Sequence, residues 1–326
     1  MKASYLDGRK IIVNDQVYLY LYGTSYLGLP YSPDFQSLFQ EGILKYGSSL
    51  GSSPNSIPQL SVYEELEHLL ASRYGFEEAL LFPSGYAAGQ TVVNLYHQQG
   101  HIVAYGNVAH PALKLESKII RPENREKTGK ASFFAMDFID PITLEKYDLN
   151  NTDSQKDKVL IDASHGLGIF DDEIKALSTA KDIIICGSLN KAMGINAGVL
   201  LCSKDLKKEL QSSLRYKTAS APSPAECYAL KRSIETGLVC DKQQKLGKLI
   251  DGFGANELFR NIKGFPVLSL KSNSPEISDY FKQQEVLIWR NNYPTEESPI
   301  VNRAVFTATH THEDVAVFLA LLDKLR

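Results

Sequence analysis

The sequence predicts an α/β fold with one large, mainly parallel sheet and a smaller α+β domain. Between residues 79 and 216, near-continuous apolar stretches of strand length alternate with helical segments. This alternation is typical of parallel strands that are covered by helices on both faces. After a helix near 222–236, the pattern changes to shorter strands interleaved with helices. Because 326 residues exceed a typical single domain, we expect a large domain over 46–225 and a small domain from 1–45 plus 226–326.

Composition excludes some classes of function. A net charge of −3, with 43% hydrophobic and 22% charged residues, is that of an ordinary globular protein. It gives no reason to expect nucleic acid or a membrane surface as a partner. The longest apolar runs are too short to span a bilayer, and the first residues have no apolar run, so we expect no signal peptide. The four cysteines lack metal-ligand spacing. We therefore expect no metal site and a reducing, cytoplasmic setting.

The first part of the chain predicts a hairpin, two helices and a loop. Residues 10–22 read as a β-hairpin that turns at Asn14-Asp15. A helix follows over 34–46, and the glycine- and serine-rich stretch 47–58 is a loop. The next helix begins at Ser61, where Ser61 and Glu64 have the spacing of a capping box, and it ends at Gly75.

The middle of the chain supplies the large sheet. Strands are expected at 79–83, 102–105, 131–136, 158–162, 182–187 and 197–202, and helices at 86–98, 110–120, 172–180 and 204–216. The last two strands are joined by a connection too short for a helical crossover, so they should be antiparallel neighbours. The small domain has expected strands at 266–271, 285–289 and 300–308 and helices at 275–284 and 312–325. We expect the N-terminal hairpin to pack with this domain.

Ligands of parallel sheets bind beyond the carboxyl ends of the strands, and three suggestive segments lie there. Ser84-Gly85-Tyr86 joins a strand to a helix, whose first N–H groups suit a phosphate. Asp162 ends an apolar strand, and its carboxylate could keep a pyridine nitrogen protonated, while His165 could donate to a ring hydroxyl. A turn and a capping aspartate are equally compatible with a purely structural role.

The remaining candidates are His110, Ser188 and Lys191. His110 lies just before Pro111 at a helix start, where its imidazole could stack on a flat ring or make only a local hydrogen bond. Ser188 could bind phosphate through its hydroxyl, three residues before Lys191. A lone lysine is usually solvated, but this one is confined in a short loop between two apolar strands. In this order, an anion turn, an acid and a Ser-x-x-Lys are what a pyridoxal phosphate (PLP) site needs.

Several motifs resemble the α-oxoamine synthase family of fold-type I PLP enzymes, which includes 8-amino-7-oxononanoate synthase and 2-amino-3-ketobutyrate CoA ligase. The resemblance runs from about Thr24 to the C-terminus. The motifs that carry it are Tyr26-Leu-Gly-Leu29, Tyr63-Glu-Glu-Leu-Glu67, Leu81-Phe-Pro-Ser-Gly-Tyr-Ala-Ala88, Asp162-Ala-Ser-His-Gly-Leu-Gly168 and Gly187-Ser-Leu-Asn-Lys-Ala-Met-Gly194.

The resemblance implies a role for each matching residue. Lys191 would form a Schiff base with PLP, Asp162 would contact the pyridinium nitrogen, and His110 would stack on the ring. The remaining cofactor contacts would come from Gly85, Tyr86 and Ser188 at the phosphate, with Ser84 in the same turn, and from His165 at the ring oxygen. Thr218 would reach the phosphate of a neighbouring subunit, which implies a homodimer with its sites at the interface. Arg290, in Ile288-Trp-Arg-Asn-Asn-Tyr-Pro294, would clamp an amino acid carboxylate.

The chain also departs from the family pattern. Ser52-Ser53-Pro54 replaces a Gly-Ser-Arg, Thr24 replaces an asparagine, and Ala135 stands where a cofactor-contacting serine is usual.

The resemblance implies an acyltransferase that condenses an amino acid with acyl-CoA. A PLP-dependent aminotransferase, or an amino acid lyase or aldolase, remains an alternative. A non-catalytic partner subunit is a remote alternative, because such subunits typically lack the lysine.

Overall fold

The computed structural model describes residues 2–106, 109–115, 131–140, 143–146, 158–180, 182–254, 256–292 and 296–325. The chain divides into two compact units. The small unit comprises Met1–Pro33, Pro141–Glu145 and Gly237–Arg326, and the large unit comprises Asp34–Asp140 and Lys146–Thr236.

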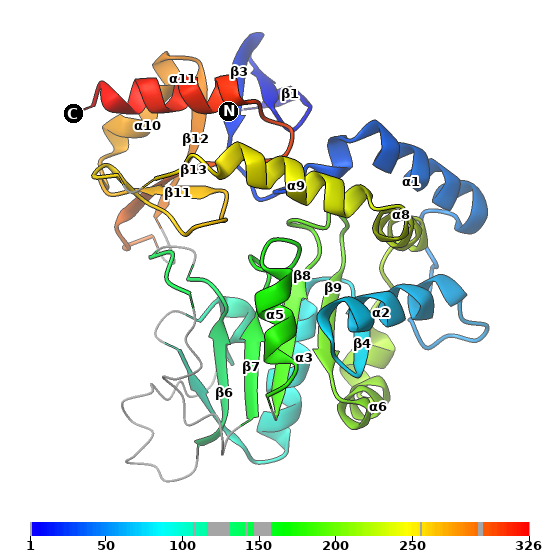
Figure 1. Cartoon of the computed structure of the whole chain (residues 1–326). Coiled ribbons are helices and arrows are strands. Elements are labelled where there is room, and N and C mark those ends of the chain that lie inside the picture. Colours follow the sequence, from blue (N-terminus) through cyan, green and yellow to red (C-terminus); the bar gives the residue numbers. More distant parts are fainter. Residues whose placement is uncertain are drawn as a thin grey trace. The chain divides into compact units, whose positions relative to one another are not determined.

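A six-stranded sheet forms the centre of the large unit, in the order β4-β9-β8-β7-β6-β5 (Figure 1). Its strands are β4 (Glu78–Phe82), β5 (Ile102–Tyr105), β6 (Ala131–Asp137), β7 (Lys158–Asp162), β8 (Ile183–Ser188) and β9 (Gly198–Cys202). Strands β5 to β8 pair in parallel, while β9 is antiparallel to both β8 and β4. Strand β4 therefore runs in the same direction as β5 to β8, and only β9 is reversed.

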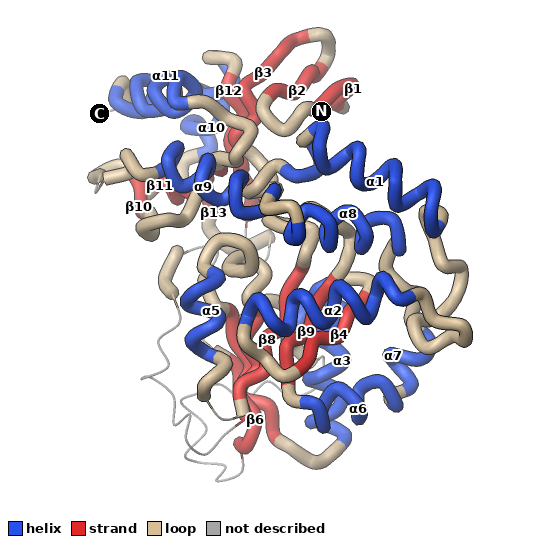
Figure 2. Tube along the Cα trace, turned by 45° about the vertical axis from the view of Figure 1, so that its right-hand side comes forward, coloured by secondary structure: helices blue, strands red, loops and turns tan. Residues whose placement is uncertain are grey.

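Helices cover both faces of this sheet (Figures 1 and 2). Helix α3 (Gly85–Gln98) packs on one face, and α2 (Ser61–Tyr74) and α5 (Asp171–Leu177) lie on the other. The unit also contains α1 (Pro33–Tyr46), η2 (Pro111–Leu113), α6 (Lys204–Ser212), α7 (Leu214–Thr218) and α8 (Pro224–Glu235). Side chains of α3 and of the sheet form one buried cluster that includes Phe82, Val92 and Leu160. The site-bearing strand ends are thus anchored in a packed core.

The small unit is built on a seven-stranded sheet in the order β1-β2-β3-β12-β13-β11-β10. These strands are β1 (Ala3–Leu6), β2 (Lys10–Val13), β3 (Gln16–Leu21), β10 (Phe259–Arg260), β11 (Val267–Leu270), β12 (Val286–Asn292) and β13 (Ile300–Val305). The hairpin β2–β3 turns at Asn14 and Asp15 and joins the C-terminal strands through the parallel pair β3–β12. The helical elements are η1 (Leu29–Tyr31), α9 (Leu238–Ile250), α10 (Pro275–Gln283) and α11 (His312–Asp323).

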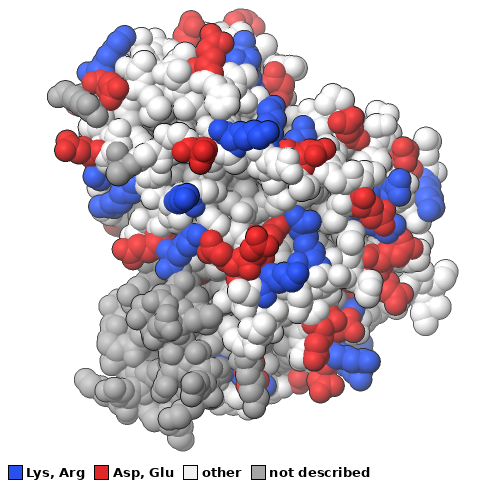
Figure 3. Space-filling view, in the orientation of Figure 1, with Lys and Arg blue, Asp and Glu red and all other residues white. Residues whose placement is uncertain are grey.

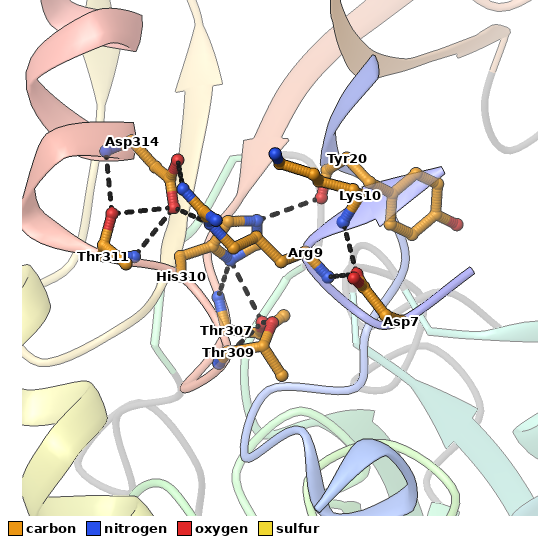
Figure 4. A network of polar contacts seen from close by, with 9 residues as sticks. All are labelled: Asp7, Arg9, Lys10, Tyr20, Thr307, Thr309, His310, Thr311 and Asp314. Atoms are coloured by element: carbon orange, nitrogen blue, oxygen red, sulfur yellow. Dashed lines mark hydrogen bonds and ion pairs between the residues drawn. The ribbon is translucent and has the colours of Figure 1, made fainter. Parts of the chain in front are cut away.

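A polar network ties the N-terminal hairpin to the start of α11 (Figure 4). Arg9 makes a two-pronged ion pair with Asp314, at 2.7 and 2.9 Å, and Asp314 completes a capping box with Thr311. The buried ring of His310 accepts from the backbone N–H of Thr307 through Nδ1, which leaves Nε2 to donate to the carbonyl of Tyr20. Burial lowers the pKa of His310. The small unit is therefore held partly by a neutral histidine.

The α/β prediction is confirmed, and the strands of the large sheet match their predicted ranges to within one residue at each end. Strands β8 and β9 are antiparallel neighbours, as predicted. The predicted capping box at Ser61 is wrong. Leu60 is the N-cap with extended backbone, so Ser61 already lies inside the helix. The predicted domain bounds near residues 46 and 225 stay a prediction.

The helix predictions needed three corrections. The helix predicted at 204–216 is broken at Ser213, which has extended backbone and caps α7 by accepting from the N–H of Tyr216. Of the helix predicted at 110–120, the structure describes only the 3₁₀ turn η2, and 116–120 lie outside the described residues. Helix α9 was not predicted.

Candidate functional site

The predicted site residues of the large unit gather where strands end. Ser84 follows β4, Asp162 ends β7 and Ser188 ends β8. Because β4, β7 and β8 run in the same direction, their carboxyl ends lie at one edge of the sheet, where ligands of such sheets bind. His110 comes shortly after β5, whose carboxyl end lies at the same edge.

The Ser84-Gly85-Tyr86 turn is in direct contact with the end of β8. A Cβ on Gly85 would come within 2.7 Å of the backbone nitrogen of Ser188, so a larger residue would displace backbone. Ser84 is the N-cap of α3 and accepts from the N–H of Ala87. The first N–H groups of a helix have no acceptor within the helix, and together with the dipole they favour an anion. Tyr86 is exposed beside them.

Asp162 is held by the loop that follows it. Its carboxylate is buried and accepts from the N–H of Ser164 at 2.8 Å. The hydroxyl of Ser164 in turn accepts from the N–H of Ser188, also at 2.8 Å. The ends of β7 and β8 are therefore connected by a chain of hydrogen bonds. His165, next to Ser164 on this loop, is half-buried.

A second set of contacts fixes the far end of the same loop. The N–H of Gly168 donates to Oδ1 of Asp171 at 2.7 Å and to the hydroxyl of Tyr74 at 3.1 Å. Arg73 pairs with the other oxygen of Asp171 at 2.6 Å. Because Tyr74 is fully buried, this network holds residues 162–168 against α2 and fixes the backbone that carries His165.

His110 is presented as a neutral imidazole. Its Nδ1 accepts from the N–H of Ala112 at 3.1 Å, which places the ring proton on Nε2. Burial lowers the pKa of His110; the nearby Lys191 charge lowers it further, while Asp162 acts in the opposite direction. A neutral ring suits stacking on a flat partner.

Lys191 lies in the tight connection between β8 and β9. The N–H of Leu189 donates to the carbonyl of Ala197 at 2.8 Å, which closes the loop. The flanking residues Ala192 and Met193 are buried, whereas Lys191 is half-buried. Its backbone is thus fixed by buried neighbours, in keeping with the confinement expected from the sequence.

Asp137 is a site residue that the sequence reasoning missed. It ends β6, directly opposite Asp162 in the parallel pairing of β6 and β7. Its Oδ2 accepts from the backbone N–H of His110 at 3.0 Å. Burial and the nearby Asp162 raise the pKa of Asp137 to about 8. The available signal was an aspartate at the end of an apolar strand next to that of Asp162.

Two predicted residues lie elsewhere in this chain. Thr218 is the exposed last residue of α7, and its hydroxyl donates to the carbonyl of Leu214. Arg290 belongs to the small unit, on β12, where its Nη1 donates to Oδ1 of Asp279 at 3.1 Å and to the carbonyl of Pro275 at 3.0 Å. Their proposed roles involve a second subunit and a substrate, respectively.

The residues present fit PLP. Because Gly85 lies close against the backbone of Ser188, the N-terminus of α3 and Ser188 are neighbours and could bind a phosphate together. Asp162 supplies a buried carboxylate for a ring nitrogen. His110 adds a neutral flat ring, and Lys191 adds an amine in the loop that follows β8. Among the described residues, no group of histidine, cysteine, aspartate and glutamate side chains could hold a metal ion.

Comparisons with known proteins test this reading. No protein-family model matches the chain. The 8-amino-7-oxononanoate synthase of Citrobacter koseri is 22% identical over 97% of this chain and 91% of its own length, and that of Vibrio cholerae is 24% identical over 94% and 87%. The match to the Pectobacterium atrosepticum enzyme, at 25% identity, covers 67% of this chain and 63% of that protein.

Solved structures show the same fold. The serine palmitoyltransferase of Sphingomonas wittichii superposes with a TM-score of 0.82 and 15% identity, and covers 97% of this chain and 89% of its own. The 8-amino-7-oxononanoate synthase of Francisella tularensis gives 0.73 and 17%, with 94% and 97% covered. This chain has the fold of these two enzymes. The resemblance read from the motifs is thereby confirmed.

One similar structure also names the cofactor. The serine palmitoyltransferase of S. paucimobilis was solved with bound PLP; it gives a TM-score of 0.81 and 15% identity, with 96% of this chain and 88% of that chain covered.

In the part of this chain that the structure describes, no helix is long and apolar enough to cross a membrane. On the face shown in Figure 3, cationic and anionic side chains are interspersed.

Proposed function

We propose that this chain is a PLP-dependent acyltransferase that condenses an amino acid with an acyl thioester. One observation carries the proposal: the ends of β7 and β8, which bear Asp162 and Ser188, are joined through Ser164 by two hydrogen bonds of 2.8 Å, and Lys191 follows in the loop after β8. The glycine turn at the N-terminus of α3 lies at the same edge of the sheet. The relatives named 8-amino-7-oxononanoate synthase and serine palmitoyltransferase support this class of reaction.

Each residue has a proposed task in holding the cofactor. Lys191 would bind it covalently, and the first turn of α3 with Ser188 would receive its phosphate. Asp162 would accept a hydrogen bond from the ring nitrogen, and the charge of its carboxylate would keep that nitrogen protonated. His110 would stack on the ring, and His165 would contact the ring oxygen. PLP supplies an electron-withdrawing ring that stabilises negative charge at the α-carbon of an amino acid.

The protein's own groups then handle the proton and the substrate. Once the amine of the substrate has taken the place of the Lys191 amine on the cofactor, the freed Lys191 can remove and return a proton at the α-carbon, as a general base and acid. Arg290 grips the substrate carboxylate with its planar fork. Its contact with Asp279 joins two side chains that are 39% and 60% exposed. Exposed ion pairs are weak, so a carboxylate of the substrate can compete for this arginine.

We further propose a cytoplasmic homodimer in which Thr218 reaches the phosphate of the partner's site. Thr218 is exposed in this chain, as that role requires. The four cysteines are free thiols, which is usual in a reducing compartment.

The test compares Lys191→Ala with Lys208→Ala, an exposed lysine of the same unit. Both purified proteins are loaded with PLP, reduced with borohydride, digested and examined by mass spectrometry. We expect PLP fixed on residue 191 of the native chain and of Lys208→Ala, and on no lysine of Lys191→Ala. Release of free CoA from acyl-CoA is measured in parallel with each common amino acid.

The product distinguishes this reaction from the alternatives. CoA release that requires both an amino acid and Lys191 supports the acyltransferase. A keto acid or an aldehyde formed without acyl-CoA indicates an aminotransferase, a lyase or an aldolase instead. Unchanged CoA release by Lys191→Ala refutes the proposed chemistry altogether.

A further inference from the structure

Two carboxyl groups lie side by side at the edge of the large sheet. Asp137 and Asp162 are the last residues of β6 and β7 and are paired in register. Neighbouring parallel strands lie about 5 Å apart, and paired residues point to the same face. Asp162 is buried and Asp137 is half-buried. Two carboxylates this close in a poorly solvated place do not both ionise easily, and such pairs tend to share one proton.

Asp137 also reaches the histidine of the site. Its carboxyl group accepts a hydrogen bond from the backbone N–H of His110 at 3.0 Å, while Nδ1 of the His110 ring accepts one from the N–H of Ala112. The backbone of His110 is therefore held by β6 and its ring by η2. Through this hydrogen bond, Asp137 links His110 to β6, which lies beside the strand that carries Asp162.

We propose that Asp137 is a further positioning residue of the site, which holds His110 through its backbone N–H and does so as a protonated carboxyl, because it lies beside Asp162. The inference rests on the proposed PLP site. The residue holds the group that faces the cofactor ring and does not itself touch the ring.

The charges around the pair agree with this assignment. Burial raises the pKa of Asp137 most, and the charge of Asp162 raises it further, to about 8. Near neutral pH the carboxyl of Asp137 is therefore mainly protonated. The other titratable groups around the pair are His110, Lys191 after β8, Asp140 after β6 and Cys186 on β8, while Lys114 acts on His110.

The experiment observes His110 in the protein without cofactor. Histidine ring carbons are labelled, and the His110 resonance is assigned by its loss in His110→Gln. In the native chain we expect this resonance to show an additional step near pH 8, as Asp137 ionises beside it. Asp137→Asn keeps a carbonyl oxygen for the N–H of His110 but cannot titrate, so the step should vanish. Asp140→Asn is the matched control, in which the step should remain.

Asp137→Ala tests the positioning role. It removes the acceptor of the His110 N–H, so we expect a shifted or broadened His110 resonance and about 2- to 10-fold weaker PLP binding. Asp137→Asn should restore both to native values at pH 7. A persistent step in Asp137→Asn, or an unchanged resonance and affinity in Asp137→Ala, overturns the proposal. The His110 resonance is observed without PLP. A Lys191→Ala result that refutes the proposed function therefore leaves this measurement of Asp137 unaffected.

Discussion

At the scale of single residues, Asp137 is expected to reduce stability while serving the site. Its pKa is about 8 in the fold, against about 3.9 in an unfolded chain. The folded state therefore keeps a proton that the unfolded state releases. The contribution of this carboxyl to stability is fully present below about pH 4 and is lost as pH rises toward 8.

Asp137→Asn should remove this loss. The asparagine is neutral at every pH, so the variant should gain stability relative to the native chain as pH rises from 4 to 8. The gain is at most about 1.4 kcal/mol per pH unit. Urea denaturation at several pH values measures it. A difference in the free energy of unfolding that does not change with pH would show that Asp137 is ionised in the fold.

Gly85 is a second residue whose identity is dictated by its neighbours. Gly85→Ala would push a methyl group to 2.7 Å from the backbone nitrogen of Ser188. The turn must then move away from β8, and we expect about 1–3 kcal/mol of lost stability together with weaker PLP binding. Gly247→Ala is the control, because no atom lies within 4 Å of its new Cβ. Unaltered PLP affinity in Gly85→Ala would show that this turn does not bind the phosphate of PLP.

The site could be read from the sequence only where residue type and position coincide. Lys191, Asp162 and Ser84 follow apolar strands and form a recognisable series. Asp137 ends a strand too, but its importance depends on register: it lies opposite Asp162 and within reach of His110. Lateral pairing between strands separated by 20 residues of sequence leaves no local pattern to read.

At the scale of elements, a buried charge cluster fixes the helices beside β4. Glu67 of α2 is buried; its Oε1 accepts from the N–H of Leu81 on β4, and its Oε2 pairs with Lys207 of α6 at 3.0 Å. Lys207 also pairs with Glu78 at 3.0 Å. Burial raises the pKa of Glu67, and Lys207 opposes that rise. The cluster joins α2, α6 and β4 just before the Ser84 turn.

Removing the lysine should be more costly than removing the whole pair. Lys207→Met leaves Glu67 buried without its cation, for which we expect a loss of about 3–5 kcal/mol in the free energy of unfolding. Adding Glu67→Gln should recover part of that loss, because no unpaired charge then remains buried. The exposed neighbour Lys208→Met is the control. If the double variant is no more stable than Lys207→Met alone, the buried-charge explanation fails.

Strands were easier to predict than helix ends. Apolar runs bounded by turn residues located β4 to β9 closely, because a strand buried on both faces leaves an uninterrupted signal. Helix ends depend on single caps. Ser213 ends α6 and caps α7 within a continuous helical pattern, and Leu60 rather than Ser61 precedes α2. Such choices are made by backbone conformation, and the residue type alone does not reveal them.

At the scale of the whole molecule, the residues with proposed tasks are distributed over different parts of the chain. Lys191, Asp162, His110 and Asp137 belong to the large unit, whereas Arg290 belongs to the small unit. Thr218 is proposed to serve a second copy of the chain. Activity measurements therefore require the full chain at concentrations that would maintain the proposed dimer.

Thr218 provides the sharpest test of the dimer. We pair a Lys191→Ala subunit with a Thr218→Val subunit and purify the heterodimer through two different affinity tags. If Thr218 acts on the partner's site, one site combines both defects, while the other has an intact Lys191 and an intact Thr218. Native PLP affinity and turnover should then return at one of the two sites.

The two homodimers are the references for this measurement. The Lys191→Ala homodimer should be inactive, and the Thr218→Val homodimer should bind PLP about 10-fold or more weakly, since a hydrogen bond to a charged phosphate is lost. If Thr218 instead acted within its own chain, the heterodimer would contain no intact site. Its only lysine-bearing site would then keep the weak affinity of Thr218→Val. Recovery of native affinity is possible only when the threonine crosses the interface.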